Sequence, residues 1–188
     1  MRRITVLLAC PLLVLLTGCG ATRTPVPDLN APAVPHGFRT HAYPSAGVRF
    51  RAPANWRVAA ASAPLVATIS SGAALVTIWR YPRTELLPTT ATALRAARAR
   101  LVEIARSRDP RMTFTSTRAT RIGGAPAIVL TGRESVSGVE RSVRSVHVYA
   151  HGAEVVFDAL ALPSAFPVVD RIVFRPAAAS LRLTEPCP

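Results

Sequence analysis

Lysine is absent from this chain of 188 residues, and all 23 of its basic residues are arginines. The absence excludes a Ser-x-x-Lys nucleophile, which needs a lysine three positions after the serine. The sequence also lacks the Gly-x-Ser-x-Gly turn that exposes the nucleophile of many serine hydrolases. No motif therefore names a reaction, and the sequence predicts no catalytic residue.

Cysteine is also scarce, with three residues in the whole chain. Cys10 and Cys19 lie near the start, and Cys187 lies between two prolines at the end. Cys10 and Cys19 belong to the signal and anchor predicted below, so Cys187 has no partner for an intramolecular disulfide. We expect it to be a free terminal thiol, the alternative being a bridge between two chains.

The apolar run at the start of the chain is too short to cross a membrane. It spans residues 4–16, behind Arg2 and Arg3, whereas a spanning helix needs about 20 apolar residues. A positive start followed by such a run is typical of a secretory signal. The alternative, a buried N-terminal helix, would be interrupted by Pro11.

The tetrad Leu16-Thr17-Gly18-Cys19 resembles the lipobox of bacterial lipoproteins. In that family the thiol takes a diacylglyceryl group, and the signal is cut just before the cysteine. Cys10 has a similar local pattern, but residues 4–9 form too short a run before it, because a signal needs about seven to fifteen apolar residues. The resemblance therefore implies a signal over residues 1–18 and lipid attachment at Cys19. Stable anchoring by acyl chains would place the domain on the outer face of a cytoplasmic membrane.

Residues 19–37 are rich in proline and show no apolar periodicity. Such segments favour extended polyproline II, so we expect a tether after the lipidated cysteine. The alternative is an irregular arm packed along the domain. Residues 38–185 have the composition of one packed domain, and about 150 residues suffice for one sizeable core.

The arginine excess gives the chain a strong positive charge. Without Arg2 and Arg3, 21 basic residues face 10 acidic ones, a net charge of +11. Two interpretations stay open: attraction to anionic lipids or acidic polymers of the envelope, and a codon bias that favours Ala, Arg and Pro together. The arginines are scattered along the sequence, and the predicted location also argues against a nucleic-acid partner.

Alternation of apolar with polar residues predicts strands through most of the domain. They are expected at residues 47–58 (with a turn at 53–55), 64–70, 73–81, 113–121, 126–134, 140–150 and 154–162. Compact turn signals at Gly123-Gly124, Ser137-Gly138 and His151-Gly152 separate the last four strands. Connections this short force neighbouring strands to run antiparallel.

Two segments change to helical spacing. In residues 90–108 the apolar residues fall on one face, with Thr89 or Thr90 as the N-cap and Asp109 as the stop. A second helix is expected from Ser164, and Pro176 is expected to end it at the preceding residue. The same spacings place five large side chains in the core: Phe50, Trp56, Trp79, Leu101 and Phe157.

The motif Gly47-Val48-x-Phe50-x-x-Pro53-x-x-Trp56 resembles the start of domains of the PsbP-like superfamily, which includes actinobacterial lipoproteins of the LpqN type. The central helix, the hairpin series and a terminal Ser180-Leu181-Arg182 are similar to that pattern as well. The resemblance implies an α+β fold with an antiparallel sheet of about six to eight strands, flanked by one long and one short helix. It carries no catalytic residues, because members of the superfamily serve mostly as binding or assembly factors.

Few side chains suggest a chemical site. His147 and His151 are four residues apart on a strand, about 13 Å, which is too far to share a metal ion. Asp158 lies inside an apolar run, where we expect an edge position or an arginine partner rather than a catalytic acid. The sequence therefore predicts no metal and no cofactor, and it leaves the ligand-binding residues unknown.

These observations favour a non-catalytic binding or assembly module of the cell envelope, held to the membrane through the lipid on Cys19. Its partner would be an envelope protein, an anionic lipid or an acidic polymer. Two alternatives remain: a carrier of an apolar ligand such as a lipid, and an envelope hydrolase whose Ser, His and Asp residues are dispersed in the sequence.

The lipobox resemblance predicts that Cys19→Ala abolishes partitioning of the protein into a detergent phase, because the acyl chains are lost. Cys10→Ala should leave partitioning intact. Phase separation and intact mass test this, and an unmodified mass with unchanged partitioning in the Cys19 variant would contradict it.

Overall fold

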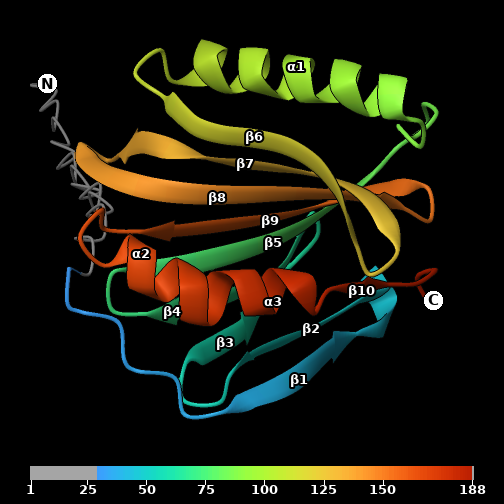
Figure 1. The fold of residues 1–188 in the computed structure, drawn as a ribbon. Helices are drawn as coiled ribbons and strands as arrows, with labels where there is room; N and C mark the ends of the chain where they lie inside the picture. The colour runs from blue at the N-terminus through green and yellow to red at the C-terminus, as the bar shows by residue number, and fades with distance from the viewer. Residues whose placement is uncertain (1–28, 188) are drawn as a thin grey trace, which may run out of the picture.

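The computed structural model describes residues 29–187, so the predicted signal, Cys19 and residues 19–28 of the predicted tether lie outside the described residues. Two antiparallel sheets form the fold, a seven-stranded sheet in the order β3-β4-β5-β9-β8-β7-β6 and a three-stranded sheet in the order β1-β2-β10 (Figure 1). The strands are β1 Phe38–Tyr43, β2 Val48–Pro53, β3 Arg57–Ala60, β4 Leu65–Ser71, β5 Ala74–Pro82, β6 Thr113–Ile122, β7 Ala125–Val136, β8 Val139–Ala150, β9 Ala153–Ala161 and β10 Arg182–Leu183. The helices are η1 Pro44–Ala46, α1 Ala91–Arg108, α2 Phe166–Val169, η2 Asp170–Phe174 and α3 Arg175–Ala179. The expected α+β class is confirmed, and no helix between residues 29 and 187 is long and apolar enough to span a bilayer.

Three two-residue turns connect β6, β7, β8 and β9 into a meander. Both residues of each turn have a positive φ, as in Ser137 (50°) followed by Gly138 (78°) and His151 (51°) followed by Gly152 (62°). Two consecutive left-handed residues form the type I′ turn, whose twist matches that of the flanking strands. The turns therefore lie where the sequence predicted them, and they set the register of four neighbouring strands.

Helices cover the two faces of the seven-stranded sheet unequally. The helical run α2–η2–α3 packs on one face, between this sheet and the three-stranded sheet, whereas α1 lies over β6 and β7 on the opposite face (Figure 1). The main core lies under the helical run and includes Phe50, Phe157 and Phe174, none of which has exposed surface. A smaller cluster under α1 includes Leu94 and Tyr149.

Three of the five predicted core residues are buried, and two are not. Phe50, Trp56 and Phe157 belong to the main core. Leu101 is half-buried at the smaller cluster, and Trp79 is half-buried on the face that carries α1, where its ring stacks on Tyr81. The alternation of β5 was correct, but α1 packs mainly on β6 and β7, and Trp79 on β5 stays half-buried.

Helix α1 begins as predicted, because the Thr90 side chain accepts a hydrogen bond from the Ala93 N–H. The expected end of the second helix at Arg175 is wrong, because helical structure continues through Pro176 to Ala179. A proline inside an α-helix removes one hydrogen bond and clashes with the preceding turn. Here the preceding turn is a wider π-helix, in which the Arg175 N–H bonds to the Asp170 carbonyl five residues earlier.

The described end of the predicted tether packs on the domain. The Asn30 carbonyl accepts from the Ala73 N–H at 2.7 Å, and the Ala33 carbonyl accepts from the Trp56 indole N–H at 2.9 Å. Gly72 allows this approach, since a Cβ there would lie 2.3 Å from the Asn30 carbonyl oxygen. For residues 30–36 the packed arm is therefore the correct alternative.

Trp56 is 5% exposed and joins this arm to the core cluster that also contains residues of the helical run. We expect Trp56→Ala to lower the free energy of unfolding by about 3–5 kcal/mol, because it removes a large buried side chain. Trp79→Ala is the matched control and should cost about 1 kcal/mol, since that ring is half-exposed. Urea unfolding measures both, and equal losses would contradict the assigned burial.

Candidate functional site

The two side chains that the sequence singled out, His147 and Asp158, are brought together by a serine. Ser145 lies directly opposite Asp158 across the β8–β9 pair, and His147 follows two residues later on the same face. The Ser145 hydroxyl donates to Asp158 Oδ1 at 2.5 Å, and its oxygen lies 3.0 Å from His147 Nε2. The dispersed Ser, His and Asp considered for a hydrolase therefore do meet.

A second carboxylate holds the other side of the histidine. His147 Nδ1 lies 2.6 Å from Glu154 Oε1, and the Tyr149 hydroxyl donates to the same oxygen at 3.2 Å. The Arg83 guanidinium donates to Glu154 Oε2. Glu154 is only 3% exposed, so these partners replace the water that the buried carboxylate has lost.

The two carboxyls have opposite pKa shifts. Burial alone would raise the pKa of Glu154, but hydrogen bonds from His147 and Arg83 outweigh it and lower the pKa to about 2. Burial raises the pKa of Asp158, and the hydrogen bond from Ser145 only partly offsets this. Glu154 is therefore ionised at neutral pH and accepts hydrogen bonds only, so His147 Nδ1 carries a hydrogen.

The expected surroundings of Asp158 were wrong. Its strand β9 is not at an edge but lies between β5 and β8. Its hydrogen-bond partner is the Ser145 hydroxyl rather than an arginine, because the two residues face each other across the ladder.

Ser145, His147 and Glu154 stand in the order of a nucleophile, a base and an orienting acid. Two features of the geometry oppose acyl transfer. The Ser145 hydroxyl is shared with Asp158 as well as His147, and Ser145 is 9% exposed in the middle of the sheet. Strand β8 is paired on both sides, so that Ser145 lies opposite Leu130 of β7 and Asp158 of β9. The backbone N–H groups near Ser145 therefore donate to neighbouring strands and are not available to stabilise an oxyanion. Ser145, His147, Glu154 and Asp158 form a hydrogen-bonded network within the sheet.

His151 lies apart from the hydrogen-bonded network of His147. It lies in the β8–β9 turn, and its Nδ1 atom is 3.1 Å from Glu185 Oε1, whereas His147 contacts Glu154. Within residues 29–187 no group of three or more His, Cys, Asp or Glu side chains is placed to hold a metal ion.

Two clefts flank helix α3, each with a volume of about 420 Å³. The α3–β2 cleft is lined by Thr40, Arg49, Phe50, Arg51, Pro176, Ala179, Ser180 and Arg182. The α3–β6 cleft is lined by Thr115, Ser116, Arg118, Thr131, Arg144 and Arg175. Each lining contains three arginines and several polar groups but no acidic residue.

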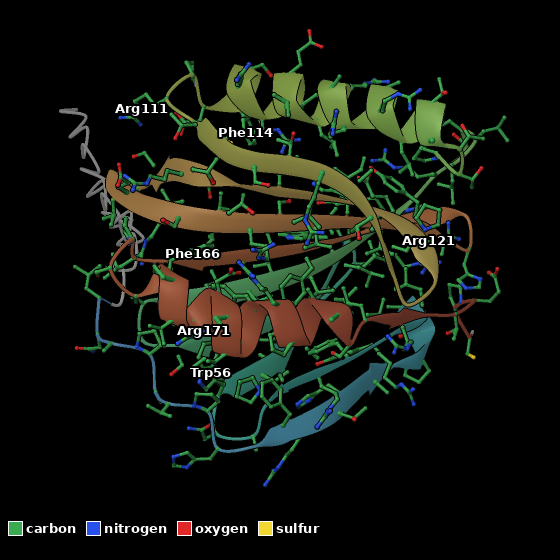
Figure 2. The ribbon with its side chains drawn as sticks, viewed as in Figure 1. Trp56, Arg111, Phe114, Arg121, Phe166 and Arg171 are labelled. Atoms are coloured by element: carbon green, nitrogen blue, oxygen red, sulfur yellow. The ribbon has the colours of Figure 1, made fainter. Side chains whose placement is uncertain are left out.

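The surroundings of the clefts add to this positive charge. Figure 2 shows Arg171 on the helical run and Arg121 on β6, toward its end. In the α3–β6 cleft the charge is partly neutralised, because Arg144 and Arg175 both donate to Asp170, which is 3% exposed. The arginines of the α3–β2 cleft form no ion pair with any carboxylate in the described part of the chain.

Sequence reasoning missed both arrangements, for different reasons. The Ser145–His147–Glu154 contacts follow from the register of one hairpin, and the two-residue turn at His151-Gly152 was a usable signal, because it places residue 150 opposite residue 153. The α3–β2 cleft offered no such signal, since Arg182 and Arg49 are far apart in the sequence and meet only through β10.

No protein-family model matches the chain, and no curated protein sequence matches it. Several solved structures are similar to it. PsbP (CyanoP) from Synechocystis sp. PCC 6803 has a TM-score of 0.60 at 14% identity, over 90% of this chain and 99% of that one. LpqN, which is involved in cell envelope biogenesis of Mycobacterium tuberculosis, has a TM-score of 0.52 at 20% identity, over 73% of this chain and 83% of that one. The Ran-binding protein Mog1p of Saccharomyces cerevisiae has a TM-score of 0.57 at 7% identity, over 79% and 96%.

The chain therefore has the PsbP-like fold, as the Gly47–Trp56 motif predicted. The similarity to LpqN is distant, and at these identities it concerns the fold.

The opposite pKa shifts predict opposite pH effects for two isosteric substitutions. The lowered pKa of Glu154 stabilises the fold at pH values above its ordinary 4.5, and this contribution is lost as the pH falls toward about 2. Glu154→Gln should therefore cost up to roughly 3 kcal/mol at pH 7, and the cost should shrink on acidification.

For Asp158 the raised pKa means that ionisation costs stability as the pH rises above its ordinary 3.8. Asp158→Asn should therefore gain stability relative to the wild type between pH 4 and pH 7. Urea unfolding across this range, extended to pH 3 for Glu154→Gln, measures both effects. If the unfolding free energy of each variant changed with pH in parallel with that of the wild type, the assigned pKa shifts would be contradicted.

Proposed function

We propose that this protein is a non-catalytic binding module of the cell envelope, anchored by the lipid on Cys19, and that its ligands are anionic. The observation that carries the proposal is the pair of arginine-lined clefts on the two sides of α3. Arg49, Arg51, Arg118 and Arg182 line them without an ion pair to any described carboxylate. Guanidinium groups that form no ion pair in a concave site attract carboxylates and phosphates.

The envelope location is supported by two independent observations. The tetrad ending at Cys19 resembles a lipobox, and the fold is shared with LpqN, a protein involved in cell envelope biogenesis. A domain held by acyl chains on the outer face of a membrane would meet anionic lipids and acidic polymers at high local concentration.

The non-catalytic part of the proposal is supported by the environment of Ser145. Its hydroxyl is shared with Asp158, and its paired strand leaves no pair of N–H groups for an oxyanion. A carrier of an apolar ligand has less support, because both clefts have arginine and hydroxyl groups in their linings.

The proposal predicts salt-dependent binding of acidic polymers. The lipidated protein in neutral detergent micelles should bind labelled polyglutamate or polyphosphate, and its affinity should fall at least tenfold between about 0.05 M and 0.5 M salt, because salt screens exposed charges. Neutral dextran is the control ligand. Affinity that does not change with salt, or no binding to either polymer, would contradict the proposal.

An esterase assay tests the non-catalytic part separately. We expect p-nitrophenyl ester hydrolysis to be the same for the wild type and for Ser145→Ala. Turnover that disappears in Ser145→Ala or His147→Gln would show an enzyme.

A further inference from the structure

The α3–β2 cleft gathers three arginines on one small sheet. Arg49 and Arg51 are alternate residues of β2, so their side chains leave the same side of the strand, and both are exposed. Strand β10 places Arg182 directly opposite Arg49. The three arginines therefore come from two adjacent strands and line one cleft.

This arrangement is electrostatically unfavourable for the protein alone. Like charges placed directly opposite each other on neighbouring strands are destabilising. Arg182 donates to the carbonyls of Ala179 and Leu181, at 3.1 and 2.8 Å, and Arg51 lies 5.8 Å from the centre of the Phe38 ring. These contacts hold two of the side chains but neutralise no charge.

The α3–β6 cleft has a carboxylate beside its arginines, and among the described residues the α3–β2 cleft does not. On the other side of α3 the buried Asp170 carboxylate pairs with both Arg144 and Arg175 and offsets part of their charge. No described carboxylate does the same for Arg49, Arg51 or Arg182. A bound anion would supply the negative charge that the α3–β2 cleft lacks.

The chemistry of the lining favours a phosphate group. Planar guanidinium forks match the oxygens of phosphates, and three of them suit a group with several oxygens and more than one negative charge. Thr40 adds a hydroxyl, whereas the Ser180 hydroxyl already donates to the Ala177 carbonyl at 2.6 Å. A volume of about 420 Å³ exceeds what a phosphate alone needs and falls in the range of small-ligand sites.

We infer that the α3–β2 cleft is a binding site for a phosphate-bearing molecule, with Arg49, Arg51 and Arg182 as the groups that hold the phosphate. The inference rests on the proposed function and makes it specific, because it names one cleft and one chemical class. The phosphate could belong to a lipid headgroup or to a soluble compound.

The test uses the lipidated mature protein, held by its anchor in phosphatidylcholine vesicles, with labelled polyphosphate as the probe. Arg49→Gln should weaken polyphosphate binding about tenfold or more, because one charge-assisted hydrogen-bonding group is lost. Arg100→Gln, exposed on α1, removes the same charge elsewhere and should change the affinity by less than about threefold.

Thermal unfolding provides a second measurement that does not depend on the polymer. Inorganic phosphate should raise the melting temperature of the wild type more than it raises that of Arg49→Gln. In chloride buffer Arg49→Gln should melt at or above the wild-type temperature, because the repulsion with Arg182 is relieved. A lower melting temperature in chloride together with an unchanged response to phosphate would overturn the inference.

The outcomes separate the inference from the proposed function. Equal losses in Arg49→Gln and Arg100→Gln, or polyglutamate binding as tight as polyphosphate binding, would overturn the phosphate site and leave a general anion-binding module. Binding of neither polymer would overturn both.

Competition by unlabelled molecules then identifies the source of the phosphate. Displacement by phosphatidylglycerol vesicles but not by glycerol phosphate points to a lipid headgroup, and the reverse points to a soluble compound. If neither competes, the inference is overturned.

Discussion

The pairing of β8 with β7 on one side and with β9 on the other is the constraint on which the rest of this structure depends. Two-residue turns set both registers, and a shift of one residue would move every side chain of β8 to the opposite face. Val146 and Val148 would then leave the main core, and Ser145 and His147 would face the helical run. The core and the buried polar network are therefore fixed by the same hydrogen-bonded ladders.

The helical run at the end of the chain organises the other half of the molecule. Its residues Val173 and Phe174 fill the core between the two sheets, while the π-helical turn keeps the run continuous up to Pro176 and beyond. Because α3 then lies between β2 and β6, the protein has a cleft on each side of one helix. Asp170 belongs to the same turn and offsets part of the charge of the α3–β6 cleft alone, so the two sites differ in charge although they share a wall.

The PsbP-like fold by itself does not select a function. Mog1p is a Ran-binding protein and LpqN is involved in cell envelope biogenesis, yet both have folds similar to this chain. What distinguishes this domain has to lie in its side chains. Two such features are the arginines of the α3–β2 cleft, which form no ion pair with a described carboxylate, and the shared hydroxyl of Ser145. The first supports binding, and the second argues against acyl transfer.

The parts of this protein that depend on local patterns could be predicted from its sequence. Alternation, the three turn dipeptides and the Thr90 cap were enough to predict β2 to β9, the meander and α1, because each depends on residues within a few positions. Strands β1 and β10 were not predicted. The burial of Trp79 and the fate of the helix at Pro176 were mispredicted, since they depend on where α1 packs and on a π-helical turn. The α3–β2 cleft was decided only by the tertiary structure, because β10 brings Arg182 next to Arg49 across more than half of the chain, and no local pattern contains that contact.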